Sequence, residues 1–287
     1  MSQMIKNRYE FVYLFDAVNS NPNGDPDSGN APRIDPQDGY GIVTDVCLKR
    51  KIRNYAQIVK ENKRPNAIFI EHHGVLNEKI KEAHEAVKTK LKGEKGATRE
   101  QVGLARQWMC NNYFDVRTFG AVMSTGENAG QVRGPVQISF SRSLDPVLPL
   151  DISITRMAVA DAKDENSLNQ TMGRKNLIPY GLYRCHGFVS ANLAQDTGFN
   201  EDDLGLLWDS LKMMWEHDRS AARTGMAPRK LIVFKHQSVL GNAPAHQLFE
   251  RVKIEKLIAD SIPRSYDNYK VTVDESGLSG VEVMKLI

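Results

Sequence analysis

Basic side chains are concentrated between Lys49 and Arg64, where the sequence holds seven of them against one acid, Glu61. This local excess is larger than the net charge of the whole 287-residue chain, which is +3. Lys49 and Arg53 are four residues apart, so in a helix they share one face. Such a face is either an ordinary solvated surface or a set of phosphate contacts, which add sequence-independent, salt-sensitive affinity for nucleic acid. The seven are Lys49, Arg50, Lys51, Arg53, Lys60, Lys63 and Arg64.

Two further segments combine positive charge with features of nucleic-acid contacts. The excursion from Asp145 to Tyr180 has an acidic, polar middle and basic arms, which predicts a projecting β-hairpin or flap. A methionine beside basic residues suits insertion between bases, because thioethers contact aromatic faces well, or it packs under its own hairpin. The arms hold Arg156, Met157, Met172, Gly173, Arg174 and Lys175. The segment DRSAARTGMAPRK adds Arg219, Arg223, Arg229 and Lys230.

The remaining reactive side chains indicate no cofactor or metal site. The cysteines Cys47, Cys110 and Cys185 lie far apart without a C-x-x-C pair, which favours a reducing cytoplasm over disulfides or structural zinc. The sequence has no G-x-x-x-x-G-K-[ST] loop and no strand-bound G-x-G-x-x-G. His72, His73 and His84 are expected at the surface. The N-terminus lacks the apolar run of a signal peptide and no segment reaches the ~20 apolar residues of a membrane span, so a cytoplasmic protein is expected.

The elements that must position these charges are predicted by periodicity and capping residues. Tyr9 to Val18 is a buried first strand, followed by the turn-forming segment SNPNGDPDSGNAPRIDPQDGYG, and loops this long are functional or disordered. Thr44 caps a helix with apolar positions at helical spacing. After Asn66 we expect a short strand (AIFIE), a charged helix from about residue 77 to 91, and a helix opened by the capping box of Thr98 and Gln101.

The second half of the chain predicts further strands and one packed helix. GPVQISFSRS alternates Val136, Ile138 and Phe140 on one face of a strand, and another strand spans 182–194. Asn200 caps a helix whose apolar stripe includes Trp208 and Trp215, which are expected in the core. KLIVFKH is a strand, and a C-terminal strand pair, NYKVTVDE and GVEVMKLI, closes the chain.

The residues from Asn66 to Arg117 are expected to be an insertion. Without this insertion and the excursion from Asp145 to Tyr180, the chain follows the order strand, helix, strand, strand, helix, strand. This is the β-α-β-β-α-β plan of ferredoxin-like, α+β folds, which RNA-recognition modules also use. The plan hosts many unrelated functions, so it does not define one.

An ordered set of motifs resembles a known family. It comprises SNPNGDPD, CLKRKIRNY, FDVRTFGAV, RGPVQISFSRS, TRMAV, TMGRKNLIPYGLYR and RTGMAPRKL, and it spans nearly the whole chain. The set is similar to the backbone subunits of CRISPR Cascade complexes, the Cas-seven family of RAMP proteins, and most similar to the type I-C (Dvulg) branch.

The resemblance implies a hand-like protein that stacks in many copies along CRISPR RNA. A ferredoxin-like (RRM-like) palm would comprise residues 1–65, 133–144 and 180–287, a helical fingers insertion 66–132, and a thumb β-hairpin 145–179. The thumb would kink the RNA and leave the other bases free to pair with target DNA. Other partners would be further Cascade subunits, Cas-five-like, large and small. The residues implied in RNA binding are Asn21, Asn23, Gly24, Lys49, Arg50, Arg53, Arg156, Met157, Met172, Arg174, Lys175, Arg219, Arg223 and Gly225.

Two nucleases remain as alternatives to this non-catalytic RNA-binding subunit. Related type III subunits cut target RNA in a metal-dependent reaction with an aspartate of the loop after the first strand. Asp25, Asp27 and Asp35 occupy that loop here, although the neighbouring prolines favour a structural turn. A nuclease that processes CRISPR RNA would need a positioned His, Tyr or Lys set. Its candidates are His186, in a strand, and His217, at the end of a packed helix.

Overall fold

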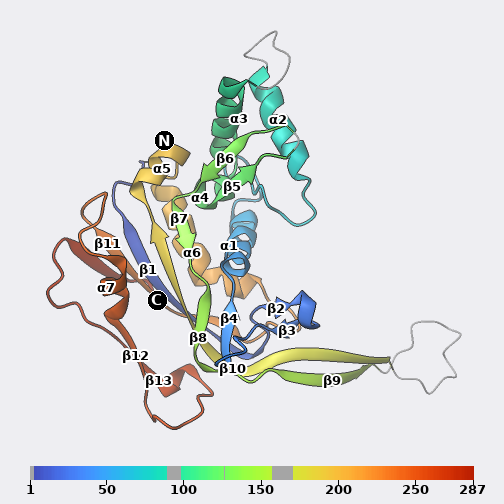
Figure 1. Cartoon of the computed structure of the whole chain (residues 1–287), viewed down its shortest axis with the longest axis vertical. Helices are drawn as coiled ribbons and strands as arrows, with labels where there is room; N and C mark the ends of the chain where they lie inside the picture. Colours follow the sequence, from blue (N-terminus) through green and yellow to red (C-terminus); the bar gives the residue numbers. More distant parts are fainter. Residues whose placement is uncertain (1–2, 89–97, 126, 157–170) are drawn as a thin grey trace, which may run out of the picture.

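The computed structural model describes residues 3–88, 98–125, 127–156 and 171–287, and the chain is a mixed α/β fold around a large antiparallel sheet (Figure 1). Its helices are α1 (Asp45–Val59), α2 (Leu76–Lys88), α3 (Arg99–Asn112), α4 (Phe114–Phe119), α5 (Ala191–Thr197), α6 (Glu201–His217) and α7 (Ala245–Glu250), with 3-10 turns η1 (Pro26–Ser28) and η3 (Tyr266–Asn268). Its strands are β1 (Tyr9–Ser20), β2 (Gly24–Asp25), β3 (Ala31–Pro32), β4 (Tyr40–Val43), β5 (Gly120–Met123), β6 (Gly130–Arg133), β7 (Val136–Ile138), β8 (Ser141–Pro146), β9 (Leu150–Arg156), β10 (Thr171–Val189), β11 (Met226–His236), β12 (Val252–Lys256), β13 (Tyr269–Val273) and β14 (Val281–Lys285).

The main sheet has the strand order β14-β11-β1-β10-β8-β4, and β7 and β9 also pair with β10. The first strand lies in the middle, antiparallel to both β10 and β11. Its run YEFVYLF is buried on both faces, because Phe11, Tyr13 and Phe15 belong to one hydrophobic core and Val12 and Leu14 to another. A strand covered on both sides is expected to be apolar throughout.

Helices α1 and α6 cover one face of this sheet, and both begin at the predicted caps. The Thr44 side chain accepts from the amide of Cys47, and Asn200 closes a capping box with Asp203. The prediction that Trp208 and Trp215 lie in the core is confirmed, since they are 9% and 1% exposed. The Nε1–H of Trp215 donates to the Tyr13 hydroxyl at 2.8 Å, which satisfies its buried donor.

Helix α7 and the β12–β13 hairpin cover the opposite face of the sheet. The expected pairing of the two C-terminal strands is wrong, because β13 pairs with β12 and β14 pairs with β11. The strand predicted over 182–194 ends at Val189, and α5 follows it. The strand predicted through Phe140 is interrupted between Ile138 and Ser141, and Phe140 is 58% exposed.

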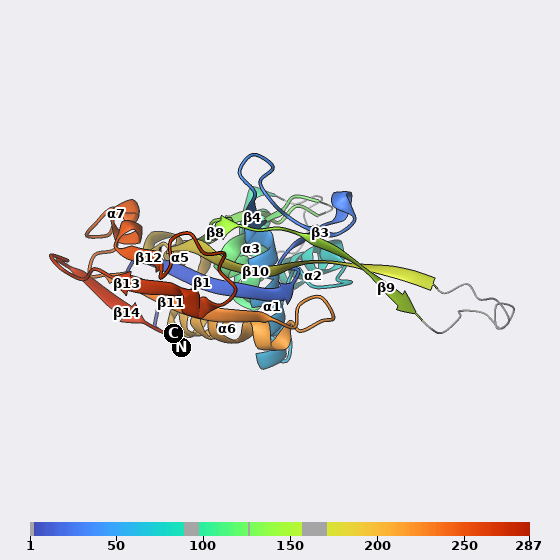
Figure 2. The same ribbon diagram turned by 90° about the horizontal axis from the view of Figure 1, so that it is seen from below.

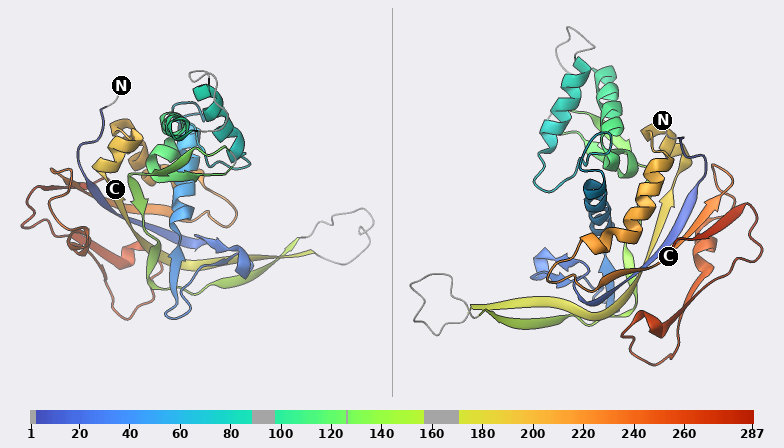
Figure 3. Two further views of the ribbon diagram at one scale, coloured as in Figure 1. Left: turned by 45° about the horizontal axis from the view of Figure 1, so that its top comes forward. Right: turned by 180° about the vertical axis from the view of Figure 1, so that it is seen from behind.

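Residues between Ala67 and Val132 form a second hydrophobic core from α2, α3, α4 and the β5–β6 hairpin. This unit rises from the sheet beside α1 (Figure 3). The capping box of Thr98 and Gln101 is confirmed. The expected strand AIFIE is wrong, because the amides of Phe69 and Ile70 donate to the Asp115 carboxylate instead of a neighbouring strand. His84 is also not at the surface: it is 2% exposed, with Nε2 3.1 Å from the Asn128 carbonyl oxygen.

The predicted projecting hairpin is confirmed by the pairing of β9 with the first third of β10, from Thr171 opposite Arg156 to Leu177 opposite Leu150. Figure 2 shows that the hairpin extends well beyond the sheet. Strand β10 then continues into the middle of the sheet, so the hairpin has a rigid base. Among the described residues, no helix combines the length and apolar character that crossing a membrane requires.

Candidate nucleic-acid interface

The loop after β1 and the loop between α6 and β11 are joined along their backbones. Val18 N donates to Gly225 O at 2.8 Å, and Asn21 N donates to Ala222 O at 2.7 Å. Gly225 N in turn donates to the Ser20 hydroxyl at 3.0 Å. These bonds hold together two of the segments that the sequence assigns to nucleic-acid binding.

Two glycines at this junction have no room for a side chain. A Cβ on Gly225 would lie 2.0 Å from the backbone oxygen of Val18, and a Cβ on Gly24 would lie 2.0 Å from Oδ1 of Asn30. The first contact is with backbone, which cannot move aside easily, and the second is with a side chain. Gly225 is therefore required for the close approach of the two loops.

Asparagines fix the loop after β1 to the start of α1. Asn23 Oδ1 accepts from both the amide and the hydroxyl of Thr44, each at 3.0 Å. Asn21, only 4% exposed, donates through Nδ2 to Asn30 O at 2.7 Å. Its Oδ1 is buried and accepts no hydrogen bond from the residues that the structure describes. Asn21 and Asn23 thus shape the loop that joins β1 to α1.

The base of the β9–β10 hairpin meets the same loops. Asn176 Nδ2 donates to Gly29 O at 2.9 Å, and Lys175 Nζ donates to Ala221 O at 3.2 Å. Between these segments lies a cleft of about 460 Å³, which we call the backbone groove. It is lined by Ser28, Gly29, Asn30, Ala31, Pro149, Leu150, Asp151, Arg174, Lys175, Asn176 and Ala222.

The basic side chains of α1 differ in how far they are free to bind a phosphate. Lys49 pairs with Asp45 at 2.8 Å, and Lys51 pairs with Asp218 at 2.7 Å. Arg50 is exposed, and among the residues that the structure describes no carboxylate pairs with it. Most of the local positive charge is therefore balanced at short range.

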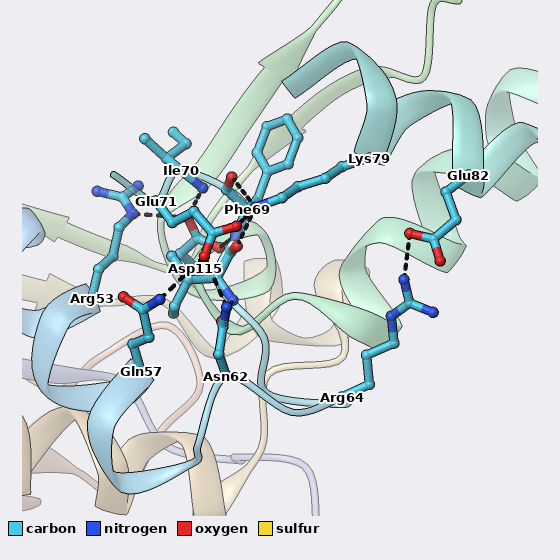
Figure 4. Close-up of polar contacts among 11 residues, drawn as sticks. Arg53, Gln57, Asn62, Arg64, Phe69, Ile70, Glu71, Lys79, Glu82 and Asp115 are labelled. Atoms are coloured by element: carbon cyan, nitrogen blue, oxygen red, sulfur yellow. Dashed lines mark hydrogen bonds and ion pairs between the residues drawn. The ribbon is translucent and has the colours of Figure 1, made fainter. Parts of the chain in front are cut away.

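Arg53 is 8% exposed, and its Nε donates to the Asp115 carboxylate at 2.8 Å (Figure 4). Lys49 and Arg53 do share one face of α1, but that face packs on Phe119, whose ring centroid lies 5.8 Å and 5.2 Å from the two cations. This corrects the expectation of a solvent-facing pair, because the Arg53 guanidinium is committed to a buried partner. Its Nε–H is therefore already bound within the protein.

Of the cations in the other two segments, Arg174 and Lys175 line the backbone groove, and Arg219 and Arg223 lie in the loop that contributes Ala222 to it. Arg174 is exposed and pairs with Asp151 at 3.3 Å, while Arg223 pairs with Asp218 at 2.8 Å. Arg219 pairs with Glu216 and donates to Thr224 O at 2.8 Å. Met172 on the hairpin is 71% exposed. The backbone of Arg156 ends β9 and its side chain is not described, and Met157 lies outside the described residues.

Asp25 and Asp35 bond to their own loop, and Asp35 also bonds to Arg142 of β8. Asp25 accepts from the amide of Asp27 at 3.2 Å and pairs with Arg33 at 3.3 Å. Asp35 accepts from the amide of Gln37 and pairs with Arg142. Within the described ranges, no three His, Cys, Asp or Glu side chains form a group that could hold a metal ion. The arrangement is that of a hydrogen-bonded turn.

His186 and His217, the two candidate nuclease residues, and Cys47 are also held by packing. The His186 ring stacks on Phe249 at 4.1 Å and accepts from Arg184 Nε at 2.9 Å, and burial lowers the pKa of His186 to about 4. His217 lies 5.5 Å from the Tyr55 ring. Burial raises the pKa of the Cys47 thiol, against the opposing effect of nearby Lys51, so the neutral thiol dominates near pH 7.

Sequence reasoning missed Asn30, Lys51 and Asn176 as residues that assemble this site. Lys51 was one charge among seven in the sequence, and only the structure reveals that it joins α1 to the loop after α6. The signal for Asn30 was local, since asparagine is enriched at left-handed turn positions and its φ is +62°. No sequence signal connects Asn176 to Gly29.

Comparison with known proteins extends this picture. The family described as CRISPR-associated protein Cas7 matches residues 7–274. A protein from Haloferax volcanii named CRISPR-associated protein Cas7 is 27% identical over 258 residues, which cover 80% of this chain and 71% of that protein. A chain of a structure described as a CRISPR RNA-guided surveillance complex, pre-nicking, has a TM-score of 0.51 and 13% identity, with 79% and 78% of the two chains covered. A second such complex contains a chain with a TM-score of 0.48 and 15% identity, with 79% and 68% covered.

The solved structure with the higher score shares the fold of this chain. The family match is the more specific finding, because it includes every strand of the main sheet except β14 and the segments that form the backbone groove. The chain therefore belongs to the CRISPR-associated protein Cas7 family.

Proposed function

We propose that this protein is a non-catalytic backbone subunit of a Cascade surveillance complex of type I-C, where it binds the backbone of CRISPR RNA. The observation that carries the proposal is the convergence of three segments at the backbone groove, namely the loop after β1, the loop after α6 and the base of the β9–β10 hairpin, with the start of α1 bonded to the first of them. Helix α1, the loop after α6 and the hairpin carry cations at the surface.

The palm of this subunit is proposed to be ferredoxin-like. The order β11-β1-β10-β8 within the antiparallel sheet, with α1 and α6 together on one face, supports this assignment. The separate core between Ala67 and Val132 supports a fingers insertion over 66–132, and the β9–β10 hairpin supports a thumb over 145–179. A palm strand over 133–144 and palm segments over 1–65 and 180–287 complete the division.

Phosphate contacts are proposed above all for Arg50, exposed on α1, and for Lys175, in the lining of the backbone groove. In the described part of the chain, neither is paired with a carboxylate. Cations that already have a carboxylate partner gain less, since the partner must be given up or shared. Asn21, Asn23, Gly24 and Gly225 act through the backbone shape of the loops, and Met172 is exposed where it could contact a base.

Several copies are proposed to assemble along one guide RNA, with other Cascade subunits at the ends and target DNA pairing to the exposed bases. An apolar surface beside the thumb supports self-association. It surrounds an open groove of about 820 Å³ and includes Leu148, 72% exposed, and Ile262, 77% exposed. Large exposed apolar patches mark protein interfaces.

Replacing Arg50 and Lys175 together by alanine is expected to weaken binding of single-stranded RNA whatever its sequence. Each lost phosphate contact reduces the slope of log affinity against log salt by roughly 0.7 to 1 unit. Fluorescence anisotropy at several salt concentrations measures both quantities. Lys253→Ala is the matched control, because this exposed lysine lies on β12, on the opposite face of the sheet. An unchanged slope in the double variant, or a loss restricted to certain RNA sequences, would contradict backbone binding.

Incubating the protein with RNA and Mg²⁺ tests both the absence of catalysis and the assembly of several copies along RNA. The RNA is expected to remain intact on a denaturing gel, and assemblies seen by size-exclusion chromatography are expected to grow with RNA length. Cleavage that disappears in Asp25→Ala with Asp27→Ala would instead establish the metal-dependent nuclease. Ile262→Asp is expected to reduce assembly while leaving the RNA intact.

A further inference from the structure

A polar cleft lies where the two hydrophobic cores of the protein meet, between α3, β6 and α5. Helix α3 and strand β6 belong to the core between Ala67 and Val132, whereas α5 packs on the core of the main sheet through Ala194. We call this space of about 440 Å³ the junction cleft, and it shares no lining residue with the backbone groove. Its lining comprises Arg106, Gln107, Cys110, Gln131, Val132, Arg133, Leu193, Asp196 and Thr197.

Two arginines of the junction cleft are free to bind an anion. Arg106 of α3 and Arg133 at the end of β6 are exposed, and in the described part of the chain neither pairs with a carboxylate. Arg142, Arg174 and Arg219 are also exposed, but each of these pairs with an acid. A guanidinium without such a partner keeps its N–H donors for a ligand, and its planar fork matches the oxygens of a phosphate.

The other donors of the cleft are also without partners. Thr197 is 2% exposed, and its buried hydroxyl has no hydrogen-bond partner among the described residues. A threonine hydroxyl on a helix can bond to a carbonyl of the preceding turn, so the missing bond leaves this donor for a ligand. The side chains of Gln107 and Gln131 are exposed at the same cleft. Burial raises the pKa of the Cys110 thiol to about 11, so the thiol is neutral near pH 7 and adds no negative charge.

Asp196 restricts the kind of anion that fits. Within the described lining it is the single acid, it is exposed, and no described cation pairs with it. A strand with several phosphates would bring further negative charge close to this carboxylate and would be repelled. A carboxylate beside a phosphate site suits a sugar hydroxyl instead, as the acidic residue that binds ribose does in dinucleotide-binding folds.

We propose that the junction cleft binds a small sugar phosphate of the mononucleotide class, with Arg106, Arg133 and Thr197 on the phosphate and Asp196 on a sugar hydroxyl. Donors that come from three different elements suit a tetrahedral phosphate better than a planar carboxylate. The volume falls within the range of about 300–1,000 Å³ that is usual for small ligands, and such sites favour junctions between structural units. The bound ligand would connect α3 and β6 to α5, and it is independent of RNA binding at the backbone groove.

Titration calorimetry of the whole chain with 5′-AMP and with inorganic phosphate, at constant ionic strength, tests this site. The parent protein is expected to bind both, and AMP more tightly. Arg106→Ala with Arg133→Ala is expected to lower both affinities at least tenfold, and Thr197→Val to lower both several-fold. Arg99→Ala is the matched control on α3, because Arg99 is exposed and does not line the cleft. Both arginines of the cleft are exposed, so their replacement is expected to keep the thermal midpoint of the unliganded protein.

Asp196→Ala distinguishes a sugar phosphate from a bare anion. It is expected to weaken AMP binding, because the hydroxyl loses its acceptor, and to strengthen binding of inorganic phosphate, because a repulsive charge is removed. A parallel change of both affinities would contradict the sugar contact.

The remaining outcomes separate this inference from the proposed function. If AMP does not bind, or binds equally well to the Arg106→Ala, Arg133→Ala variant, the junction site is refuted, while RNA binding is judged by its own salt slope. If Arg50→Ala with Lys175→Ala abolishes AMP binding, AMP occupies the backbone groove and the inference fails. If an RNA hexanucleotide displaces AMP as effectively as unlabelled AMP does, the cleft takes a nucleic-acid strand, and the inference again fails.

Discussion

Replacing Asp115 by alanine is expected to lower the free energy of unfolding by about 3–5 kcal/mol, the usual cost of removing one partner from a buried ion pair. The Asp115 side chain is 1% exposed and accepts from three donors. These are Arg53 Nε at 2.8 Å, Phe69 N at 2.7 Å and Ile70 N at 3.0 Å. Alanine would leave a guanidinium and two amides without their acceptor.

The position of Asp115 explains why the effect should be large. It joins α1 to the segment that leads into α2, and Figure 4 shows its carboxylate between these two parts. Beside it a second carboxylate, Glu71, accepts from Gln57 at 3.1 Å and Asn62 at 2.8 Å and pairs with Lys79. Asp115 and Glu71 both connect α1 and its following loop to the segment before α2. Because Glu71 still holds these parts in place, the loss of Asp115 cannot be relieved by a small local shift.

Urea denaturation followed by tryptophan fluorescence measures this change. Asp45→Ala is the matched control, because Asp45 lies in α1, the helix of Arg53, and pairs with Lys49 while remaining partly exposed. Its loss is expected to cost less than about 1 kcal/mol. Equal effects of the two substitutions would mean that the buried contacts of Asp115 contribute no more than a surface pair.

Local sequence signals predicted the parts of this structure that depend on neighbouring residues. Thr44, Thr98 and Asn200 cap helices as expected, since a cap needs only the next few amides. The buried first strand and the hairpin arms followed from composition and alternation. Where alternation failed, at Phe140, the cause was a bulge, which depends on the register against β10.

The assembly of the site could not be predicted because its contacts join distant residues. Arg53 and Asp115 are 62 positions apart, and Asn176 lies 147 positions from its partner Gly29. The sequence showed a cluster of charge in α1 but not which members were already paired. Motif resemblance singled out FDVRTF, whereas only the structure reveals that its charged residues are buried and bonded to α1 and α6.

Arg117, the other charged residue of that motif, provides a second prediction of comparable size. It is 5% exposed and binds Asp203 of α6 with two nitrogens, at 2.8 Å and 2.7 Å. It also donates to Pro65 O at 2.7 Å and to the Asn66 side chain. Such a planar, bidentate pair cannot be reproduced by lysine. Arg117→Lys and Arg117→Met are both expected to lower stability, the methionine variant by about 3–5 kcal/mol.

A double-mutant cycle separates the ion pair from the other contacts of Arg117. Asp203→Leu alone leaves the buried guanidinium unpaired and removes an acceptor of the Asn200 amide at 3.2 Å. The double variant Arg117→Met with Asp203→Leu is expected to be more stable than the sum of the single losses predicts, by about 1–3 kcal/mol. Additive losses would mean that the pair itself contributes nothing and that the stabilisation comes from the bonds of Arg117 to Pro65 and Asn66. Because the pair joins α4 to α6 and does not line the backbone groove, the folded double variant should keep the salt slope of RNA binding.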